Sequence, residues 1–493
     1  EDDVEHCLAY TYNFSHNLCT LKKHGVLLAL PLGLRPNDLS RCKFPYFQAH
    51  FKVKLGIFAP EMKYNTCTLS NGLRVIHLPS ASPVVYCGYQ VGAGSRHEDR
   101  GDEGLAHFCE HVTFKGTERR SAWSILNSLE QVGGSLNAYT NKEDTCYYAA
   151  ILKEHLTRAV GLLTDIVFHS TYPQAEIDKE VEVIGDEIDS YNDSPAELIF
   201  DEFENILFDG HPLGHNILGS TERVHAFTTA DALRFARKHY RTDNAVFFAY
   251  GDINFAQLVR MLKRATEGMA VGAAEPNLLP FGAATEPSAH RVEPSKAVPT
   301  KEIASPLWGR VILSDRDTHQ AHVVMGCRSY DAHDPRRTSL YLLNNMLGGP
   351  GMNARLNVAL RERHGLVYTV ESSMVSYSDT GVWCTYFGCD HHDTRRCLRL
   401  VRHELNRFMQ APLSESQLRA AKRQLIGQIG VACDSRESFA LDFGRIYLHY
   451  GLEKDIEALC RRVEAVTAES LMEVARDLFA PENLTTLIFG NHA

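Results

Sequence analysis

The residue types best suited to chemistry in this 493-residue chain lie in one short segment, Gly104–Thr117 (GLAHFCEHVTFKGT). Within it, His107, Glu110 and His111 form the pattern H-x-x-E-H, the inverted order of a motif that zinc peptidases place on a helix. On a helix the two histidines lie one turn apart on the same face, with the glutamate beside them. Two imidazoles can then hold a metal ion while the carboxylate takes a proton from water. The motif alone leaves open the alternative of a helix flank with two surface histidines.

A third ligand is predicted from the segment Gln174–Tyr191, which has the pattern of an amphipathic helix. Glu180 and Glu187 lie seven residues apart, which places them within about 20° of each other around the helix. Both are about 80° from the centre of the apolar stripe, so we expect them to border the core. An unpaired carboxylate is costly there, and a metal or imidazole partner would explain it. The alternative is an acidic helix that carries two carboxylates on its flank. The apolar stripe consists of Ile177, Val181, Ile184 and Ile188.

Together these motifs resemble the pitrilysin family of zinc metallopeptidases, the inverzincins. Within that family the chain is most similar to the branch of the mitochondrial processing peptidase beta subunit and the bacterial insulinase-like proteins. The resemblance extends from about Tyr64 to the C-terminus. Beyond the two segments above, it rests on the stretches Leu69–Val75 (LSNGLRV), Gly92–Glu98 (GAGSRHE), Phe114–Thr117 (FKGT), Gly133–Thr140 (GGSLNAYT), Glu143–Tyr148 (EDTCYY) and Gly214–Thr221 (GHNILGST).

The resemblance implies a role for each residue that matches the family's zinc site. His107, His111 and Glu187 would bind one Zn²⁺ per chain, and Glu110 would be the general base. Glu180 matches an additional glutamate of the family, which would orient a histidine from outside the ligand set.

The resemblance also implies substrate-binding residues. Asn137 and Ala138 lie in the stretch that resembles the family's edge strand, where they would pair with the main chain of an extended peptide. Arg361 and Tyr368 match a pair that lies across the cavity from the zinc. Arg361 would bind a substrate carbonyl and Tyr368 would donate to the oxyanion. From chemistry alone, the second pair is equally well explained as a basic helix end followed by a strand aromatic.

An internal repeat indicates two homologous domains. Thr228–Gly251 aligns without gaps with Thr467–Gly490, and each copy is predicted to be a helix, a turn and a strand. Strands such as Val84–Val91 mixed with helices such as Leu156–Phe168 indicate an α+β class. We therefore expect two α/β-roll domains, a half-clamshell in the terms of the family. The predicted boundaries are an extension without family resemblance at 1–61, a catalytic domain at 62–270, a Pro-rich linker at 271–308 and an inactive homologous domain at 309–493.

Composition excludes several other classes of protein. A net charge of −10 argues against nucleic-acid binding. No apolar stretch reaches the roughly 18 residues of a membrane span. Thirteen cysteines without a framework spacing fit a reducing compartment. A bacterial cytoplasm is therefore expected. The mitochondrial matrix fits less well, because the chain opens with acidic residues where presequences are rich in arginine.

The function expected from these observations is that of a zinc-dependent endopeptidase, acting as a homodimer on extended peptides or unfolded segments inside a closed chamber. The alternative is a catalytically inactive structural or processing-complex subunit with the same fold. His107, Glu110, His111 and Glu187 are all present, which favours the enzyme.

Overall fold

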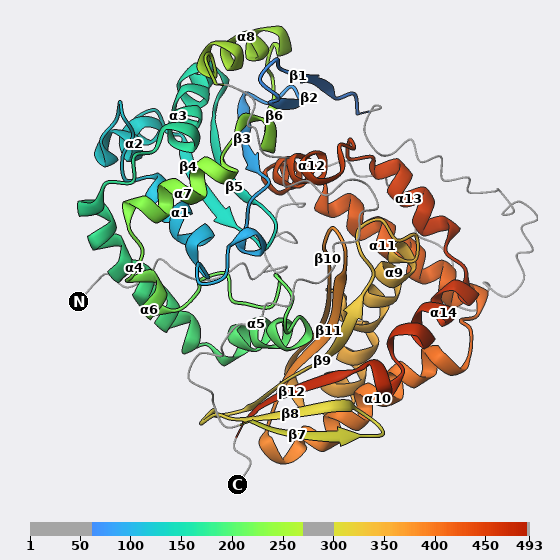
Figure 1. The fold of residues 1–493 in the computed structure, drawn as a ribbon. Coiled ribbons are helices and arrows are strands. Elements are labelled where there is room, and N and C mark those ends of the chain that lie inside the picture. The colour runs from blue at the N-terminus through green and yellow to red at the C-terminus, as the bar shows by residue number, and fades with distance from the viewer. Residues whose placement is uncertain (1–61, 270–299, 491–493) are drawn as a thin grey trace, which may run out of the picture. The chain divides into compact units, whose positions relative to one another are not determined.

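The computed structural model describes residues 62–269 and 300–490, which belong to one compact unit, Phe58–Ala493. The expected extension 1–61 and most of the expected linker lie outside the described residues. The described chain forms two similar halves, each with one sheet and several helices (Figure 1), so the predicted α+β class is confirmed. We call residues 62–269 the first half and residues 300–490 the second half.

The first half is built on a six-stranded sheet with the order β1-β2-β6-β3-β5-β4. Strands β2 and β6 are parallel, whereas the other neighbours are antiparallel. In the described chain β4 pairs only with β5, so it is an edge strand. The strands are β1 (Asn65–Thr68), β2 (Arg74–Pro79), β3 (Val84–Val91), β4 (Ser135–Thr140), β5 (Thr145–Leu152) and β6 (Ala245–Gly251).

The helices of the first half include two whose positions the sequence predicts well. The segments expected at Leu156–Phe168 and Gln174–Tyr191 form α3 and α4, and the apolar stripe expected on α4 is buried. The helices are α1 (Leu105–Thr113), α2 (Ala122–Glu130), α3 (Leu156–His169), α4 (Gln174–Asn192), α5 (Pro195–Leu207), α6 (Thr221–Val224), α7 (Thr229–His239) and α8 (Phe255–Ala265), with short 3₁₀ turns η1 (Ser95–His97), η2 (Lys153–His155) and η3 (Thr242–Asn244).

The second half repeats this topology with the strand order β10-β11-β9-β12-β8-β7. Strand β7 lies within the range expected for the linker, where it pairs with β8. The strands are β7 (Thr300–Ser305), β8 (Gly309–Asp315), β9 (Ala321–Ser329), β10 (Val367–Ser376), β11 (Gly381–Cys389) and β12 (Thr485–Gly490). The helices are α9 (Arg337–Gly348), the π-helical η4 (Asn357–Glu362), α10 (Thr394–Gln410), α11 (Glu415–Ala432), α12 (Arg436–Tyr450), α13 (Ile456–Ala465) and α14 (Ala468–Leu478), with 3₁₀ turns η5 (His391–Asp393) and η6 (Pro481–Asn483).

The repeat predicted from the sequence is present in both halves. Each copy forms a helix, a 3₁₀ turn and a strand, namely α7-η3-β6 and α14-η6-β12. The two helices begin in the same way, because Thr228 and Thr467 are both N-cap residues of a capping box. Local capping chemistry of this kind is encoded in the sequence and does not depend on the rest of the fold.

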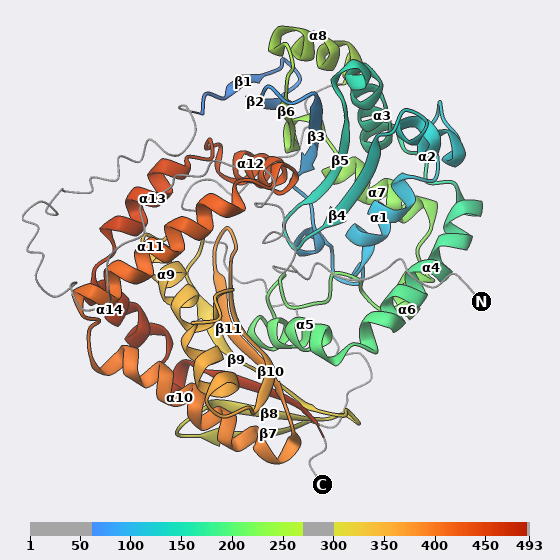
Figure 2. The same ribbon diagram turned by 180° about the vertical axis from the view of Figure 1, so that it is seen from behind.

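Each sheet is covered on one face by a helix of the other half. Successive residues of β6 point to opposite faces. Phe247 joins the core beneath α3, while Phe248 forms an edge-to-face contact with Phe443 of α12. In the same way, Leu198, Ile199 and other residues of α5 pack on the second sheet. Figure 2 shows the two exchanged helices from behind.

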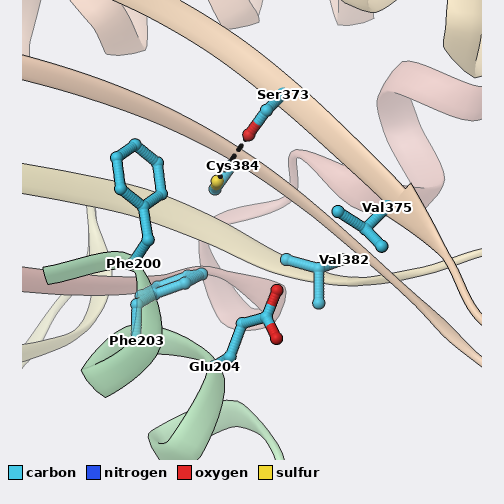
Figure 3. A pocket seen from close by; sticks show the side chains of 7 residues that line it. All are labelled: Phe200, Phe203, Glu204, Ser373, Val375, Val382 and Cys384. Carbon is cyan, nitrogen blue, oxygen red and sulfur yellow. Dashed lines mark hydrogen bonds between the residues drawn. The ribbon is translucent and has the colours of Figure 1, made fainter. Parts of the chain in front are cut away.

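The contact of α5 with the second sheet encloses a small apolar cavity of about 180 Å³ (Figure 3). Glu204 is its one ionisable group apart from a thiol, and the carboxylate accepts a hydrogen bond of 2.9 Å from Tyr377. Burial raises the pKa of Glu204. The cavity is lined by Phe200, Phe203, Glu204, Ser373, Val375, Val382 and Cys384.

In the described ranges no helix is long and apolar enough to cross a membrane. The ten cysteines of these ranges are free thiols. Cys109, inside the helix of the H-x-x-E-H motif, is fully buried among apolar side chains.

Candidate metal centre

Helix α1 carries the H-x-x-E-H motif with its apolar side packed into the core of the first half. Leu105, Phe108, Cys109 and Val112 are fully buried. The opposite side of α1 is in contact with β4 and α4. The pattern of apolar residues therefore fixes the rotation of the helix, and this rotation presents the three polar residues of the motif to the edge strand and to α4.

The structure brings the three predicted ligands together. Nε2 of His107 lies 3.8 Å from Oε2 of Glu187, and Nε2 of His111 lies 3.3 Å from the same oxygen. The two imidazole rings are 4.6 Å apart between centroids. One donor atom from each residue lies within 4.8 Å of the others. This spacing lets two nitrogens and one oxygen bind the same ion.

The chemistry of these donors fits zinc, which proteins bind with imidazole nitrogen and carboxylate oxygen. His107 is buried, and its Nδ1 atom has no hydrogen-bond partner in the described chain. Burial and the neighbouring His111 lower the pKa of His107 to about 4. His107 is therefore neutral at physiological pH, which is the form in which imidazole binds a metal.

His111 is held from both sides by carboxylates. Its Nδ1 donates a hydrogen bond of 3.0 Å to Oε1 of Glu180, which leaves Nε2 directed at Glu187. Burial acts to lower the pKa of His111, but the hydrogen bonds to Glu180 and Glu187 outweigh it and raise the pKa to about 9. A metal ion bound at Nε2 must displace this proton.

Glu180 and Glu187 differ in exposure, although the sequence predicts that both border the core. Glu180 is buried, and its second oxygen pairs with Lys115 at 2.5 Å. The side chain of Glu187 is 46% exposed. The prediction is therefore right for Glu180 and wrong for Glu187. Ile184 and Ile188, on either side of Glu187 along α4, are buried, so the helix still packs on the core there. Glu187 lies on the flank of this buried stripe, where its side chain is partly open to solvent and reaches both imidazoles.

Glu110 lies beside the histidines and is held by the edge strand. Thr140, the last residue of β4, donates a hydrogen bond of 2.6 Å to Oε2 of Glu110. Burial raises the pKa of Glu110, and the hydrogen bond from Thr140 only partly opposes this effect. A carboxylate with a raised pKa in this position is suited to accept and return a proton near neutral pH.

The predicted substrate-binding residues fall in two places. Asn137 and Ala138 lie on the edge strand β4, as expected, with Asn137 exposed and Ala138 half-buried. Arg361 is in η4 and Tyr368 is on β10, where the guanidinium lies 5.6 Å from the ring centroid. Tyr368 is 82% exposed. Within the described chain neither Arg361 nor Tyr368 forms an ion pair or hydrogen bond with the three predicted ligands.

Two residues that complete the centre were not predicted from the sequence. Thr140 holds Glu110, and Lys115 holds Glu180. Both belong to stretches that carry the family resemblance, GGSLNAYT and FKGT. The signal was therefore present in the chain, but their contacts depend on how β4 and α4 meet α1, which spacing along the sequence does not reveal.

Comparison with known families gives two matches that together cover most of the described chain. Residues 74–221 match the model described as Insulinase (Peptidase family M16), and residues 226–425 match the Peptidase M16 inactive domain. The first range contains the three predicted ligands and Glu110. The second contains Arg361 and Tyr368.

Similar proteins occur in bacteria. A Streptomyces coelicolor protein named uncharacterized zinc protease SCO5738 is 32% identical over 83% of this chain and 86% of its own length. The Bacillus subtilis protein named uncharacterized zinc protease YmxG is 30% identical over 85% of this chain and 97% of its own length. Among solved structures, a protease from Helicobacter pylori superposes with a TM-score of 0.76 at 20% identity, over 87% of this chain and 99% of that one. This last likeness supports the fold.

Proposed function

The chain belongs to peptidase family M16, and from this premise we propose that it is a zinc-dependent endopeptidase that hydrolyses extended peptides. The observation that carries the proposal is the geometry of four side chains. Donor atoms of His107, His111 and Glu187 lie within 4.8 Å of one another, and Glu110 stands beside the two histidines on the same helix. The bacterial relatives are named as zinc proteases, and these names support the same assignment.

A zinc ion held by His107, His111 and Glu187 would supply Lewis-acid activation of water and of the scissile carbonyl. Glu110 accepts the proton of the attacking water and then delivers it to the leaving amine. Thr140 keeps the carboxylate of Glu110 in place through its hydrogen bond of 2.6 Å. Of the two carboxylates of α4 that contact His111, Glu187 would be a ligand, while Glu180 orients His111 through Nδ1.

The edge strand supports a substrate in extended conformation. β4 carries Asn137 and Ala138 and ends at Thr140, next to Glu110. A peptide added to this edge would place its main chain beside the general base. Arg361 and Tyr368 would contact the same peptide, the arginine at a carbonyl and the tyrosine at the developing oxyanion. We place the reaction in a closed chamber formed by two chains.

The test is digestion of a library of unstructured peptides by the full chain, with and without a chelator, followed by addition of Zn²⁺. Glu110→Gln should retain zinc and lose most of the activity, because the amide cannot accept the proton. Glu182→Gln is the matched control, since Glu182 is an exposed glutamate of α4 outside the ligand set. Cleavage by Glu110→Gln at the wild-type rate would refute the mechanism, and an inactive wild-type chain that binds zinc would favour the structural-subunit alternative.

A further inference from the structure

Helix α1 starts without a capping side chain of its own. Its N-cap is Gly104, which adopts a φ of 98° in the left-handed region and has no side chain to accept a hydrogen bond. The carboxylate of Glu98, six residues earlier, takes this role. Oε2 accepts from the amide of Gly104 at 3.0 Å, and Oε1 accepts from the amide of Ala106 at 2.7 Å. An external carboxylate thus satisfies the amides that open the helix.

Glu98 is itself held in place from the far side. Its side chain is 1% exposed, and Nε2 of His215 donates to its Oε2 at 2.9 Å. The same nitrogen lies 3.1 Å from the carbonyl oxygen of Ser95. Lys142 donates from Nζ to the carbonyl oxygen of His215. Lys142 lies just after Thr140, the last residue of the edge strand β4. The residues that hold Glu98 in place are therefore connected to this strand.

The loop that carries His215 also contacts the start of α1 directly. A Cβ on Gly104 would lie 2.8 Å from the carbonyl oxygen of Leu218, and a Cβ on Gly219 would lie 2.4 Å from the carbonyl oxygen of Glu103. Only glycine permits this approach of the two backbones. The loop therefore holds the first turn of α1 by close packing as well as through the pair of Glu98 and His215.

We propose that Glu98 and His215 are positioning residues for hydrolysis, because they fix the first turn of α1 and so place His107 and Glu110 relative to Glu187. This inference rests on the proposed function. His107 is the third residue of α1, next to Ala106, whose amide Glu98 binds. The α1 helix transmits a shift of its first turn to both residues. A displacement of about 1 Å at a reacting group can cost about 100-fold in rate.

The kinetic test uses Glu98→Gln and His215→Gln in the full, zinc-loaded chain. We expect kcat for a peptide to fall by about 10- to 100-fold in each variant. KM should change little, because the edge strand that binds the peptide is unaltered. The double variant should lose about as much as the worse single variant, since the two side chains act through one contact.

The matched control is Asp165→Asn. Asp165 is a buried carboxylate of the same half, and it accepts a hydrogen bond of 2.8 Å from Thr117 and pairs with Arg120. Its loss should lower the melting temperature, as the loss of Glu98 should, while kcat and KM stay at their wild-type values in the folded protein. Measurements are compared at a temperature at which all variants are fully folded.

Two measurements do not depend on hydrolysis. In Glu98→Gln the amides of Gly104 and Ala106 should exchange hydrogen faster, and the zinc affinity measured by chelator competition should fall by about 10-fold or more. If Glu98→Gln keeps the wild-type kcat and zinc affinity, or if these two quantities fall no further than in Asp165→Asn, Glu98 is a structural residue and the inference is wrong. If the wild-type chain hydrolyses no peptide, the proposed function fails, and exchange and zinc affinity alone then decide whether Glu98 positions the helix.

Discussion

Two glutamates on one helix illustrate how position on α4 determines the role of identical side chains. Glu187 directs one oxygen at both imidazoles, whereas Glu180 accepts from the Nδ1 of His111 and pairs with Lys115. We therefore expect Glu187→Gln to bind zinc much more weakly. Glu180→Gln should retain zinc and lose about 10- to 100-fold in affinity or activity. Zinc content after dialysis and chelator competition measure both effects. Metal loss confined to Glu180→Gln would show that Glu180, and not Glu187, is the zinc ligand.

The protonation of His111 predicts how zinc affinity depends on pH. In the metal-free protein the hydrogen bonds to Glu180 and Glu187 outweigh burial and raise the pKa of His111 to about 9. Below this pH a proton competes with zinc for Nε2, so zinc affinity should rise as the pH increases towards about 9 and level off above it. Glu180→Gln removes one of the groups that retain the proton, and the rise should then end at a lower pH. Affinity that is independent of pH between 6 and 8 would contradict this interpretation.

At the scale of elements, helix α12 contacts the first sheet through a glycine, Gly444. A Cβ on Gly444 would lie 2.8 Å from the ring of Phe248, which is fully buried and packed against Phe443. We expect Gly444→Ala to destabilise the protein by about 1–3 kcal/mol through overpacking. Gly427 on α11 is the matched control, because a Cβ there meets nothing within 4 Å.

Gly427→Ala should be neutral or stabilising by up to about 1 kcal/mol, since alanine is the better helix former. Thermal unfolding of both variants is the measurement. Equal shifts of the melting temperature in the two variants would mean that α12 can adjust its distance from the first sheet.

Those parts of the fold that depend on local patterns were predictable from the sequence. The strand Val84–Val91 was predicted with the bounds that β3 has, and α4 extends only one residue beyond the predicted segment. His107 and His111 could be proposed from the motif on their own helix, whereas the helix pattern offered both Glu180 and Glu187 and the family resemblance selected Glu187. The exchange of α5 and α12 between the halves was not predictable, because both helices have an ordinary amphipathic pattern that does not specify which sheet they cover. The hydrogen bond between His215 and Glu98 was not predicted for a related reason, because the two residues lie 117 positions apart in the sequence.

At the scale of the whole molecule, the exchange of helices means that neither sheet buries both faces within its own half. Phe248 of the first sheet is covered by α12, and the apolar side of α5 covers the second sheet. Polar contacts accompany the exchange. Arg96 pairs with Asp379 across the two halves, and His449 lies 2.8 Å from Asp144. The first half and the second half therefore depend on each other for stability.

The last prediction concerns a site shared between two chains. Of the two groups of three possible metal donors in the described chain, only the group in the first half contains two histidines, whereas Tyr368 lies exposed on β10 of the second half. We expect a two-fold homodimer in which the zinc site of one chain is completed by Arg361 and Tyr368 of the partner. Glu110→Gln and Tyr368→Phe dimers should each be nearly inactive, for different reasons, and both should retain zinc.

Subunit exchange between these two variants tests whether Tyr368 acts at the zinc site of its own chain or at that of the partner chain. Random exchange makes half of the dimers mixed, and each mixed dimer has one site with both Glu110 and Tyr368 intact. About one quarter of the wild-type activity should then return. Exchange is verified independently with differently tagged chains. If tagged chains exchange and no activity returns, Tyr368 acts within its own chain or takes no part in the reaction, and a monomer with full activity in sizing experiments would refute the shared site.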